Sequence, residues 1–497
     1  MNTSEILARN ARKYPTHEAL IYEDQRLTYA ALDEYVTNLA HSLAALGIGY
    51  RDPVVLFMPN SIEFAVSYFA IQRAGSIVIP ISAHATKYEI EHIIAHSQAK
   101  ALIVHDLLYP IVGEINGVIC LKTGDKAGHF ESMRYLMSHQ QGSRQALPSL
   151  NEDDLASILY TSGTTSQPKG VLFNYRSLLA MTHMVAIEME LKPDSKPIIA
   201  MPMSHAASLH LFFISSMMIG APVVIMQEFS AVKMLALIQH ERTTHFFGVP
   251  FYYLMLARSE KLPYTDLSTM IWWVYGGAPM SREEVQFVMD KMNTQRLVGF
   301  YGLTETGPSG SILFPDVHDH GAGSIGNHAP YGSELRVVNE QGLDTQPGEV
   351  GEIWIKGATN MVGYINADEE NDHIFDNGWL KTGDLAKRDD DGFVWIVDRK
   401  NDIIITAGQI VYSREVEEIL IQMDGIHEVA VVGVPHPEFG EIVKAFYAAD
   451  NHIDATVLGD YANEYLATYK VPRRYERLDV LPRNISGKVL KQELKND

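Results

Sequence analysis

The chain has 497 residues, of which 46% are hydrophobic and 20% are charged. This length exceeds what a single hydrophobic core usually supports, so we expect more than one domain. With 40 basic and 61 acidic residues the net charge is −21, and such an acidic excess argues against nucleic acid or an anionic membrane surface as a partner.

The sequence does not indicate export or membrane insertion. Cys120 is the single cysteine, so no internal disulfide can form, and a reducing cytoplasm is the expected location. Residues 1–20 carry charges where a signal peptide needs an apolar stretch. No window reaches about 18 uninterrupted apolar residues, so we expect no integral membrane segment.

The first part of the chain alternates helix patterns with short apolar runs. Residues 28–47 have apolar side chains three or four positions apart, with Thr28 suited to cap the helix and Gly47 to end it. A second helix pattern spans 61–75, and the apolar runs that we predict as strands are 53–58, 76–81 and 101–106. Apolar strands that alternate with helices predict a parallel sheet covered on both faces.

The alternation resumes further along the chain. The apolar runs that we predict as buried strands there are 222–227, 244–249, 269–277 and 296–302. Glycines lie near the ends of the last three runs. Ligands of parallel sheets bind at the carboxyl ends of the strands, so these glycines mark a candidate site.

The pattern changes again towards the C-terminus. From about Ser324 strands and turns alternate, and after Asp398 an acidic helix, a strand and a basic tail follow. We therefore predict an α/β fold with a large N-terminal domain, in which helices cover parallel sheets and a β-rich subdomain is added, and a small mobile α+β C-terminal domain. The predicted boundaries are 1–398 and 399–497.

The segment SILYTSGTTSQPKGVLF, residues 157–173, places hydroxyls, glycines and a lysine between two apolar runs. Glycines let backbone amides approach a ligand, and hydroxyls with the Lys169 ammonium suit phosphate oxygens. The segment is not a Walker loop, because no glycine precedes Lys169, no serine or threonine follows it, and a strand is expected next. It predicts a phosphate cradle, with a solvated surface loop as the alternative.

A second motif, GFYGLTETG at 299–307, follows a predicted strand. Tyr301 is suited to stack on a base, Thr304 to meet a phosphate, and Glu305 to hold Mg²⁺, which prefers oxygen ligands. The alternative is a strand followed by a polar turn.

Two further motifs lie nearer the C-terminus. NGWLKTGD ends at Asp384, a carboxylate suited to ribose hydroxyls, although a capped turn is the alternative. LPRNISGKVLK contains Lys488 next to Gly487, and by itself such a lysine usually faces solvent.

In order and spacing, these four motifs resemble those of the acyl- and aryl-adenylate-forming family, which includes acyl-CoA synthetases, peptide-synthetase adenylation domains and firefly luciferase. The resemblance covers essentially the whole chain. It implies an AMP-forming acid–thiol ligase that uses ATP, Mg²⁺, a carboxylic acid and CoA.

The resemblance also implies which residues contact ATP. At the phosphates they are Thr161, Ser162, Gly163, Thr164, Thr165 and Lys169. Around the adenine they are Gly276, Gly277, Ala278 and Tyr301, and at the ribose Asp384 and Arg399.

The implied catalytic residues are Thr304 at the α-phosphate, Glu305 at Mg²⁺, and Lys488 between the incoming carboxylate and the α-phosphate. In this family the C-terminal domain closes over the adenylate and then rotates at a hinge, here Asn401. The rotation brings the loop that contains Gly408 to the site, where a pantetheine thiol attacks the acyl carbonyl.

The chain departs from the family pattern at three places. Ser166 stands where glycine is usual in the phosphate loop, and Asn401 replaces the usual aspartate or lysine of the hinge. Residues 406–411 read TAGQIV, whereas acyl-CoA synthetases commonly have Ser-Gly-Gly-Glu-Asn-Ile there. Gly408 is kept, so thiol entry is expected.

The segment from 202 to 224 lies where the family places its acyl pocket. His205 matches a family histidine that lines or gates this pocket, with a core histidine as the alternative. Apolar side chains surround it, and either an acyl pocket or plain helix core accounts for them: Phe212, Phe213, Met217 and Met218. We predict a fatty or other apolar acid, then an aromatic or cyclic acid. The acidic residue that peptide synthetases present to an amino group is missing, which argues against an amino acid.

The sequence is also compatible with alternatives to an acyl-CoA ligase. The thiol could belong to an acyl carrier protein, or the adenylate could be oxidised as in luciferase. A catalytically silent nucleotide-binding protein is disfavoured because Lys169, Glu305 and Lys488 are all present. Family members are often homodimers, although no sequence signal for an interface is evident.

Overall fold

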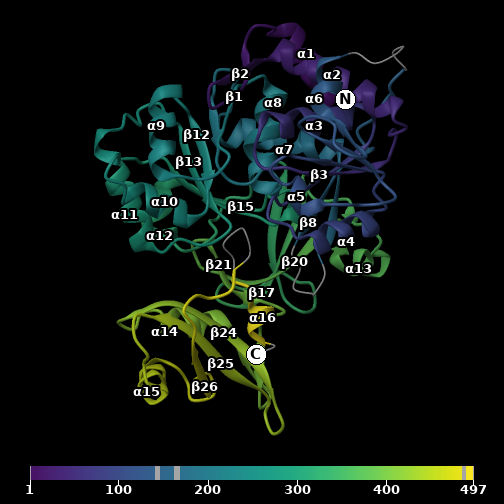
Figure 1. The fold of residues 1–497 in the computed structure, drawn as a ribbon. Helices are drawn as coiled ribbons and strands as arrows, with labels where there is room; N and C mark the ends of the chain where they lie inside the picture. The colour runs from purple at the N-terminus through teal and green to yellow at the C-terminus, as the bar shows by residue number, and fades with distance from the viewer. Residues whose placement is uncertain (1, 140–145, 162–167, 484–488, 496–497) are drawn as a thin grey trace. The chain divides into compact units, whose positions relative to one another are not determined.

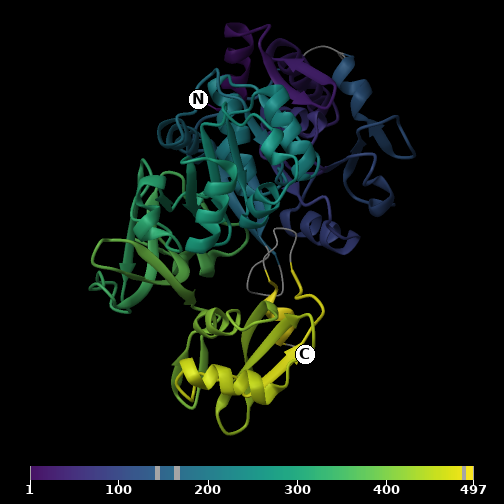
Figure 2. The same cartoon turned by 90° about the vertical axis from the view of Figure 1, so that its left-hand side faces the viewer.

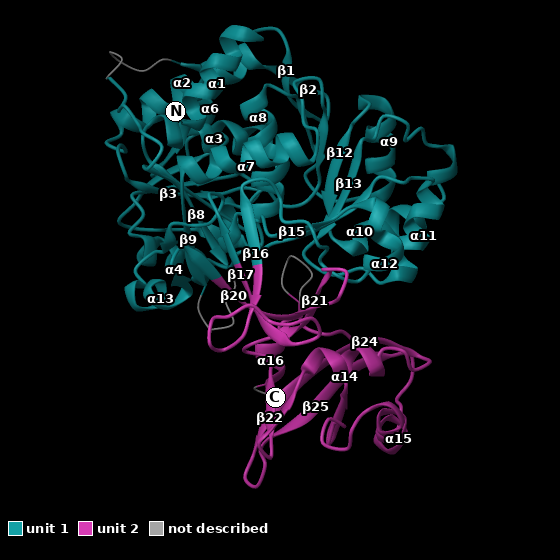
Figure 3. Cartoon of the chain, turned by 180° about the vertical axis from the view of Figure 1, so that it is seen from behind, with its two compact units in different colours: residues 1–335, 355–380 teal, residues 336–354, 381–497 magenta. Residues whose placement is uncertain are grey.

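The computed structural model of the chain describes residues 2–139, 146–161, 168–483 and 489–495. These residues divide into two compact units, one of residues 1–335 with 355–380 and the other of 336–354 with 381–497 (Figure 3). The second unit therefore includes segments that lie before residue 398, and the domain boundary at 398 stays a prediction.

The first unit contains two twisted sheets with mainly parallel cores. One has the order β15 (Ser311–Leu313), β14 (Leu297–Tyr301), β13 (Trp272–Gly276), β12 (His245–Gly248), β10 (Pro197–Ile199), β11 (Val223–Ile225), β1 (Glu18–Tyr22), β2 (Gln25–Thr28). The other has the order β18 (Gly363–Tyr364), β9 (Lys169–Asn174), β8 (Leu155–Thr161), β4 (Ile77–Ile81), β3 (Pro53–Phe57), β5 (Ala101–Val104), β6 (Ile119–Lys122), β7 (Phe130–Ser132). The apolar runs predicted from the sequence form strands of both sheets.

Helices cover these sheets, and they begin where the sequence places caps. Thr28 caps α2 (Tyr29–Ala45) by accepting from the amide of Ala31, and Ser61 caps α3 (Ile62–Arg73) by accepting from that of Phe64. The other helices of this unit are α1 (Thr3–Lys13), α4 (Lys87–Ser97), α5 (Tyr109–Val112), α6 (Met133–Ser138), α7 (Tyr175–Glu188), α8 (Ser215–Ile219), α9 (Ala231–Glu241), α10 (Pro250–Ala257), α11 (Arg282–Met292), α12 (His318–Gly321) and α13 (Asp368–Ile374). Figure 1 shows α9, α10 and α11 beside β12 and β13.

Short irregular helices connect these elements. They are the π-helix η1 (Ala207–Ile214) and the 3₁₀ turns η2 (Leu262–Tyr264), η3 (Thr304–Thr306) and η4 (Pro315–Val317). The sequence did not predict η1. π-helices are rare in proteins, and many of those that do occur lie at functional sites.

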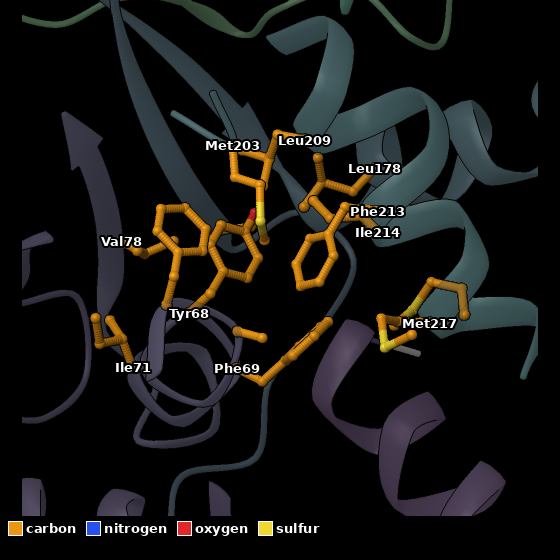
Figure 4. Packing of buried hydrophobic residues seen from close by; sticks show 14 of the residues in the cluster. Tyr68, Phe69, Ile71, Val78, Leu178, Met203, Leu209, Phe213, Ile214 and Met217 are labelled. Carbon is orange, nitrogen blue, oxygen red and sulfur yellow. The ribbon is translucent and has the colours of Figure 1, made fainter. Parts of the chain in front are cut away.

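The core of the first unit packs α3 against η1. Figure 4 shows Tyr68 and Phe69 of α3 facing Phe213 of η1, and the ring centroids of Phe69 and Phe213 are 5.8 Å apart. Met217 is completely buried in the same cluster. Phe213 and Met217 thus pack as core residues, and their part in an acyl pocket stays a prediction.

A further sheet has the order β16 (Ser333–Val338), β17 (Val350–Gly357), β20 (Trp379–Arg388), β19 (Phe375–Asp376), with β21 (Val394–Arg399) paired to β20. This is the β-rich region that the sequence predicts after Ser324. Strands β16, β17 and β20 contain the positions at which the chain passes from one unit to the other.

The C-terminal part of the second unit is an α+β arrangement. Its sheet has the order β23 (Gln409–Val411), β22 (Ile404–Thr406), β25 (Gly440–Ala449), β24 (Ile426–His436), with β26 (Arg474–Arg477) paired to β25. Its helices are α14 (Ser413–Leu420), α15 (Ala455–Tyr465) and α16 (Lys491–Lys495), and Figure 2 shows this green-yellow to yellow part from the side. Helices α14 and α16 lie against β24.

In the residues that the structure describes, no helix is long and apolar enough to cross a membrane.

We expect the first unit to lose stability as the pH falls below about 6.5, because it buries neutral histidines. Burial lowers the pKa of His210 to about 3 and those of His245 and His318 to about 4. Below the unfolded pKa the unfolded chain binds more protons than the native one, so the stability present at neutral pH is lost on acidification. The three groups together should cost roughly 4 kcal/mol per pH unit between about pH 6.5 and 4.5.

Denaturant unfolding at pH 7, 6 and 5 measures this slope. Replacement of His318 by glutamine should reduce the slope by about a third, and the same replacement of the exposed His84 is the control variant. A free energy of unfolding that is constant over this range would contradict the assignment of the buried histidines as neutral groups.

Candidate active site

The predicted phosphate loop connects two antiparallel strands. Thr161 ends β8 and Lys169 begins β9, and these residues are directly opposite each other in the register. A strand therefore follows Lys169, as the sequence predicts. Ser162, Gly163, Thr164 and Thr165 lie outside the described residues.

Lys169 has acidic and aromatic neighbours within its own unit. Its ammonium forms an ion pair with Glu370 of α13, and it lies 5.4 Å from the ring centroid of Tyr364 in β18. Strand β18 pairs with β9, so Tyr364 is brought next to Lys169 although 195 positions separate the two in the numbering.

Tyr364 also contacts the predicted metal carboxylate. Its hydroxyl donates to Oε1 of Glu305 at 2.9 Å. Burial raises the pKa of Tyr364, and the negative charge of Glu305 raises it further. The phenol therefore stays protonated at neutral pH and remains a hydrogen-bond donor, which holds the Glu305 carboxylate in one orientation.

Backbone contacts fix the turn that carries Thr304 and Glu305. The amide of Met361 donates to the carbonyl of Glu305 at 2.8 Å, and the amide of Leu303 donates to Oγ1 of Thr306 at 3.0 Å. Gly307 ends the turn at φ 76°, and a Cβ there would lie 2.4 Å from the carbonyl oxygen of Thr359. Only glycine fits this position, so η3 is held tightly at the end of β14.

The residues predicted around adenine lie on neighbouring strands. Gly276 ends β13 and is opposite Phe300 of β14, so that Tyr301 is the next residue along the adjacent strand. A Cβ on Gly276 would lie 2.5 Å from the carbonyl oxygen of Phe300. Gly277 follows at φ 78° and leads to Ala278. The structure thus brings Gly276 and Tyr301 together at the carboxyl ends of the strands.

His205 lies just before η1. Burial lowers its pKa, and its Nε2 atom is buried without a hydrogen-bond partner among the described residues. The imidazole is therefore neutral at pH 7, and its role at the acid stays a prediction.

In the second unit the structure pairs the two predicted ribose residues. Asp384 of β20 is opposite Arg399 of β21, and Arg399 Nε lies 3.1 Å from Asp384 Oδ1. The Asp384 side chain is buried, whereas Arg399 is partly exposed. An aligned carboxylate and guanidinium offer both an acceptor and a donor to a diol.

Gly408 lies at the tip of a tight hairpin in the same unit. Strands β22 and β23 pair as far as Thr406 and Gln409, which leaves Ala407 at φ 51° and Gly408 at φ 78° as the turn. Positive φ at both turn residues is the pattern of a two-residue hairpin turn, and it explains the glycine. The predicted thioester segment is therefore a hairpin.

Lys488 lies outside the described residues. The residues on both sides of its segment form hydrogen bonds within the second unit. The amide of Leu490 donates to the carbonyl of Pro482 at 2.8 Å. Lys491 donates to Oγ of Ser413 at 2.7 Å and to Oε1 of Glu417 at 2.8 Å. Helix α14 thus anchors the chain three residues beyond Lys488.

The described residues contain no group of three or more histidine, cysteine, aspartate or glutamate side chains suited to a metal ion. A single carboxylate such as Glu305 fits Mg²⁺ that is held mainly by phosphate oxygens and water.

Tyr364 and Glu370 are the residues that the sequence analysis missed. Both lie between β17 and β20, in a segment with no motif of its own, and their relation to Lys169 and Glu305 depends on strand pairing. No local sequence pattern marks either residue.

The chain is similar to known proteins over nearly its whole length. Residues 7–365 match the family model described as AMP-binding enzyme, and residues 415–488 match its C-terminal domain. A long-chain-fatty-acid–CoA ligase of Mycobacterium tuberculosis is 30% identical over 99% of this chain and 98% of its own length. A feruloyl-CoA synthase of Amycolatopsis is 32% identical over 98% of this chain and 97% of its own length.

A solved structure extends the similarity to the fold. The o-succinylbenzoate CoA synthetase of Bacillus subtilis, in complex with its acyl-adenylate intermediate, has a TM-score of 0.87 and is 27% identical, covering 100% of this chain and 98% of the other. The predictions of family, fold class and enzyme class, an acid–thiol ligase, are confirmed. The chain belongs to the family of AMP-binding enzymes.

Proposed function

We propose that the protein activates an apolar carboxylic acid with ATP and Mg²⁺ and then transfers the acyl group to the thiol of CoA. The observation that carries this proposal is the connection of Lys169, suited to phosphate, and Glu305, suited to Mg²⁺, through the buried Tyr364. The names of the relatives, which are CoA ligases, support it.

In the first step a carboxylate oxygen of the acid attacks the α-phosphorus of ATP. The bond from this phosphorus to the bridging oxygen breaks, and pyrophosphate leaves. Thr161, Lys169 and the intervening segment bind the phosphates, and Thr304 donates to the α-phosphate. Glu305 would hold Mg²⁺, and the positive charge of the ion would favour the departure of pyrophosphate.

Other residues orient the nucleotide. Asp384 and Arg399 hold the ribose hydroxyls, and Tyr301 stacks on the adenine beside Gly276 and Gly277. Lys488 neutralises the repulsion between the incoming carboxylate and the α-phosphate.

In the second step the thiolate sulfur attacks the acyl carbonyl carbon, the bond from this carbon to the AMP oxygen breaks, and AMP leaves. The hairpin with Gly408 gives the thiol access. CoA is the proposed thiol, and a carrier-protein pantetheine is the second candidate because Thr406–Val411 differs from the usual segment of acyl-CoA synthetases.

The proposed acid is a fatty or other apolar acid, followed by an aromatic one. The named substrates of the relatives support this choice, because they include a long-chain fatty acid and feruloyl groups. A reducing cytoplasm is the proposed location, and a homodimer stays a prediction.

Pyrophosphate release tests the proposal. It should be measured with ATP and Mg²⁺ over a panel of fatty, aromatic and dicarboxylic acids, each with and without CoA. Strong CoA-dependent turnover on one acid class is the expected result. Pyrophosphate release that does not depend on CoA, together with acyl transfer to a pantetheine-bearing carrier protein, would assign the carrier-protein thiol as the acceptor. The absence of pyrophosphate release with every acid would refute the proposed activity.

A further inference from the structure

The lysine proposed to bind ATP phosphate already has an anionic partner in this chain. Lys169 Nζ forms an ion pair with Oε1 of Glu370, and the two side chains are 25% and 39% exposed. A carboxylate oxygen and a phosphate oxygen make the same kind of charge-assisted hydrogen bond to an ammonium group. Glu370 therefore contacts Lys169 in the manner of a phosphate.

The position of Glu370 is fixed by its neighbours. Asn371 accepts from the amide of Tyr364 at 2.7 Å and donates to the carbonyl of the same residue at 2.9 Å. A Cβ on Gly363 would lie 3.0 Å from the Asn371 side chain, so glycine permits this close approach. Helix α13 is thus tied to β18, and the residue before Asn371 is held at the start of β9.

We propose that Glu370 is an intramolecular competitor of the ATP phosphates for Lys169, so that ATP must displace it before the lysine can bind phosphate. This inference rests on the proposed function. A partly exposed ion pair is weak, so the triphosphate displaces Glu370 readily, and the competition lowers ATP affinity by about five-fold or less. After displacement the Glu370 carboxylate stays near the phosphates and repels them.

The competition has a distinctive dependence on ligand and on salt. It acts on ligands whose phosphates reach Lys169 and leaves adenosine binding unchanged. Because both side chains are partly exposed, added salt should weaken their attraction and the repulsion of the phosphates. The gain in ATP affinity on removal of the Glu370 charge should therefore be largest at low ionic strength.

Isothermal titration with the non-cleavable analogue α,β-methylene-ATP and Mg²⁺ tests the inference. Glu370→Gln should bind the analogue about two- to five-fold more tightly than the wild-type protein. Glu369→Gln is the matched control, because it removes the same charge from the adjacent, exposed position of α13, and its affinity should equal that of the wild type. Adenosine should bind all three proteins equally, which also shows that they are folded.

A double-mutant cycle tests whether the affinity change caused by Glu370→Gln depends on Lys169. In a Lys169→Met background, Glu370→Gln should add much less than it adds to the wild type, because the competition requires the ammonium group. Unchanged analogue binding by Glu370→Gln would overturn the inference, and weaker binding would overturn it and assign Glu370 an orienting role instead.

The two hypotheses fail in different ways. If the wild-type protein binds the analogue, and Lys169→Met weakens this binding, but Glu370→Gln does not strengthen it, only the competition is refuted. If none of the proteins binds the analogue, the proposed function fails, and the inference fails with it.

Discussion

Replacement of Lys488 by alanine is expected to lower pyrophosphate release by at least about 100-fold, the size of effect seen when one stabilising donor is removed from a transition state. The proposed role explains this loss. A carboxylate that approaches the α-phosphate of ATP is repelled by it, and the Lys488 ammonium offsets the charge that develops between them. The effect should appear in kcat for adenylation.

The second half-reaction is the internal control for this variant. Preformed acyl-AMP should still be converted to thioester at a rate close to that of the wild type, because this step proceeds without attack on phosphorus. Lys491 anchors the adjacent chain to Ser413 and Glu417, so the substitution at 488 leaves that anchor in place. Equal loss of both half-reactions would show that Lys488 has a structural role rather than the assigned one.

Replacement of Glu305 by glutamine is expected to lower pyrophosphate release by about 100-fold or more, because the neutral amide binds Mg²⁺ much less well than a carboxylate. The loss should be partly recovered at high Mg²⁺ concentration. A titration of activity against Mg²⁺ at saturating ATP measures this shift. Loss of activity with an unchanged Mg²⁺ dependence would remove Glu305 from the metal site.

The Tyr364→Phe variant tests how the orientation of the Glu305 carboxylate affects Mg²⁺ binding, because it removes the orienting hydroxyl and keeps the charge of Glu305. Loss of the hydroxyl that donates to Glu305 should raise the Mg²⁺ requirement by about 10-fold, as is common for groups that hold a metal ligand. Tyr264→Phe removes a phenol that is 85% exposed and should have no effect. An identical Mg²⁺ dependence for both variants would show that Tyr364 does not act through the metal.

Local signals predicted the elements of the fold well. Two helices begin at the predicted caps, Thr28 and Ser61. Strands of the structure lie within the predicted apolar runs 53–58, 76–81 and 296–302. The strand predicted at 269–277 begins later, at Trp272. Ser268 and Thr269 form a turn, which is closed by the hydrogen bond from the amide of Met270 to the carbonyl of Leu267, and Met270 and Ile271 precede the strand. The tertiary structure sets this boundary, because an apolar run in the sequence does not show at which residue the hydrogen bonding to a neighbouring strand begins.

The sequence could not predict which strands become neighbours. Strand β1 pairs with β11, so that Leu20 is opposite Val223, and no local pattern encodes a pairing over that separation. Strand order depends on how all helices cover both faces of the sheets at once. The π-helix η1 was missed for a similar reason, because its residues are as apolar as those of an ordinary buried helix.

By itself the sequence determined the chemistry that the site can offer: hydroxyls and Lys169 for phosphate, Glu305 for a cation, and glycines where a backbone must turn or approach closely. These properties reside in single side chains or in residues a few positions apart. Only the tertiary structure decided that Tyr364 holds Glu305, that Glu370 pairs with Lys169, and that Asp384 faces Arg399. Such partners lie on different strands or helices, and their contact follows from sheet pairing and core packing, which no short stretch of sequence specifies.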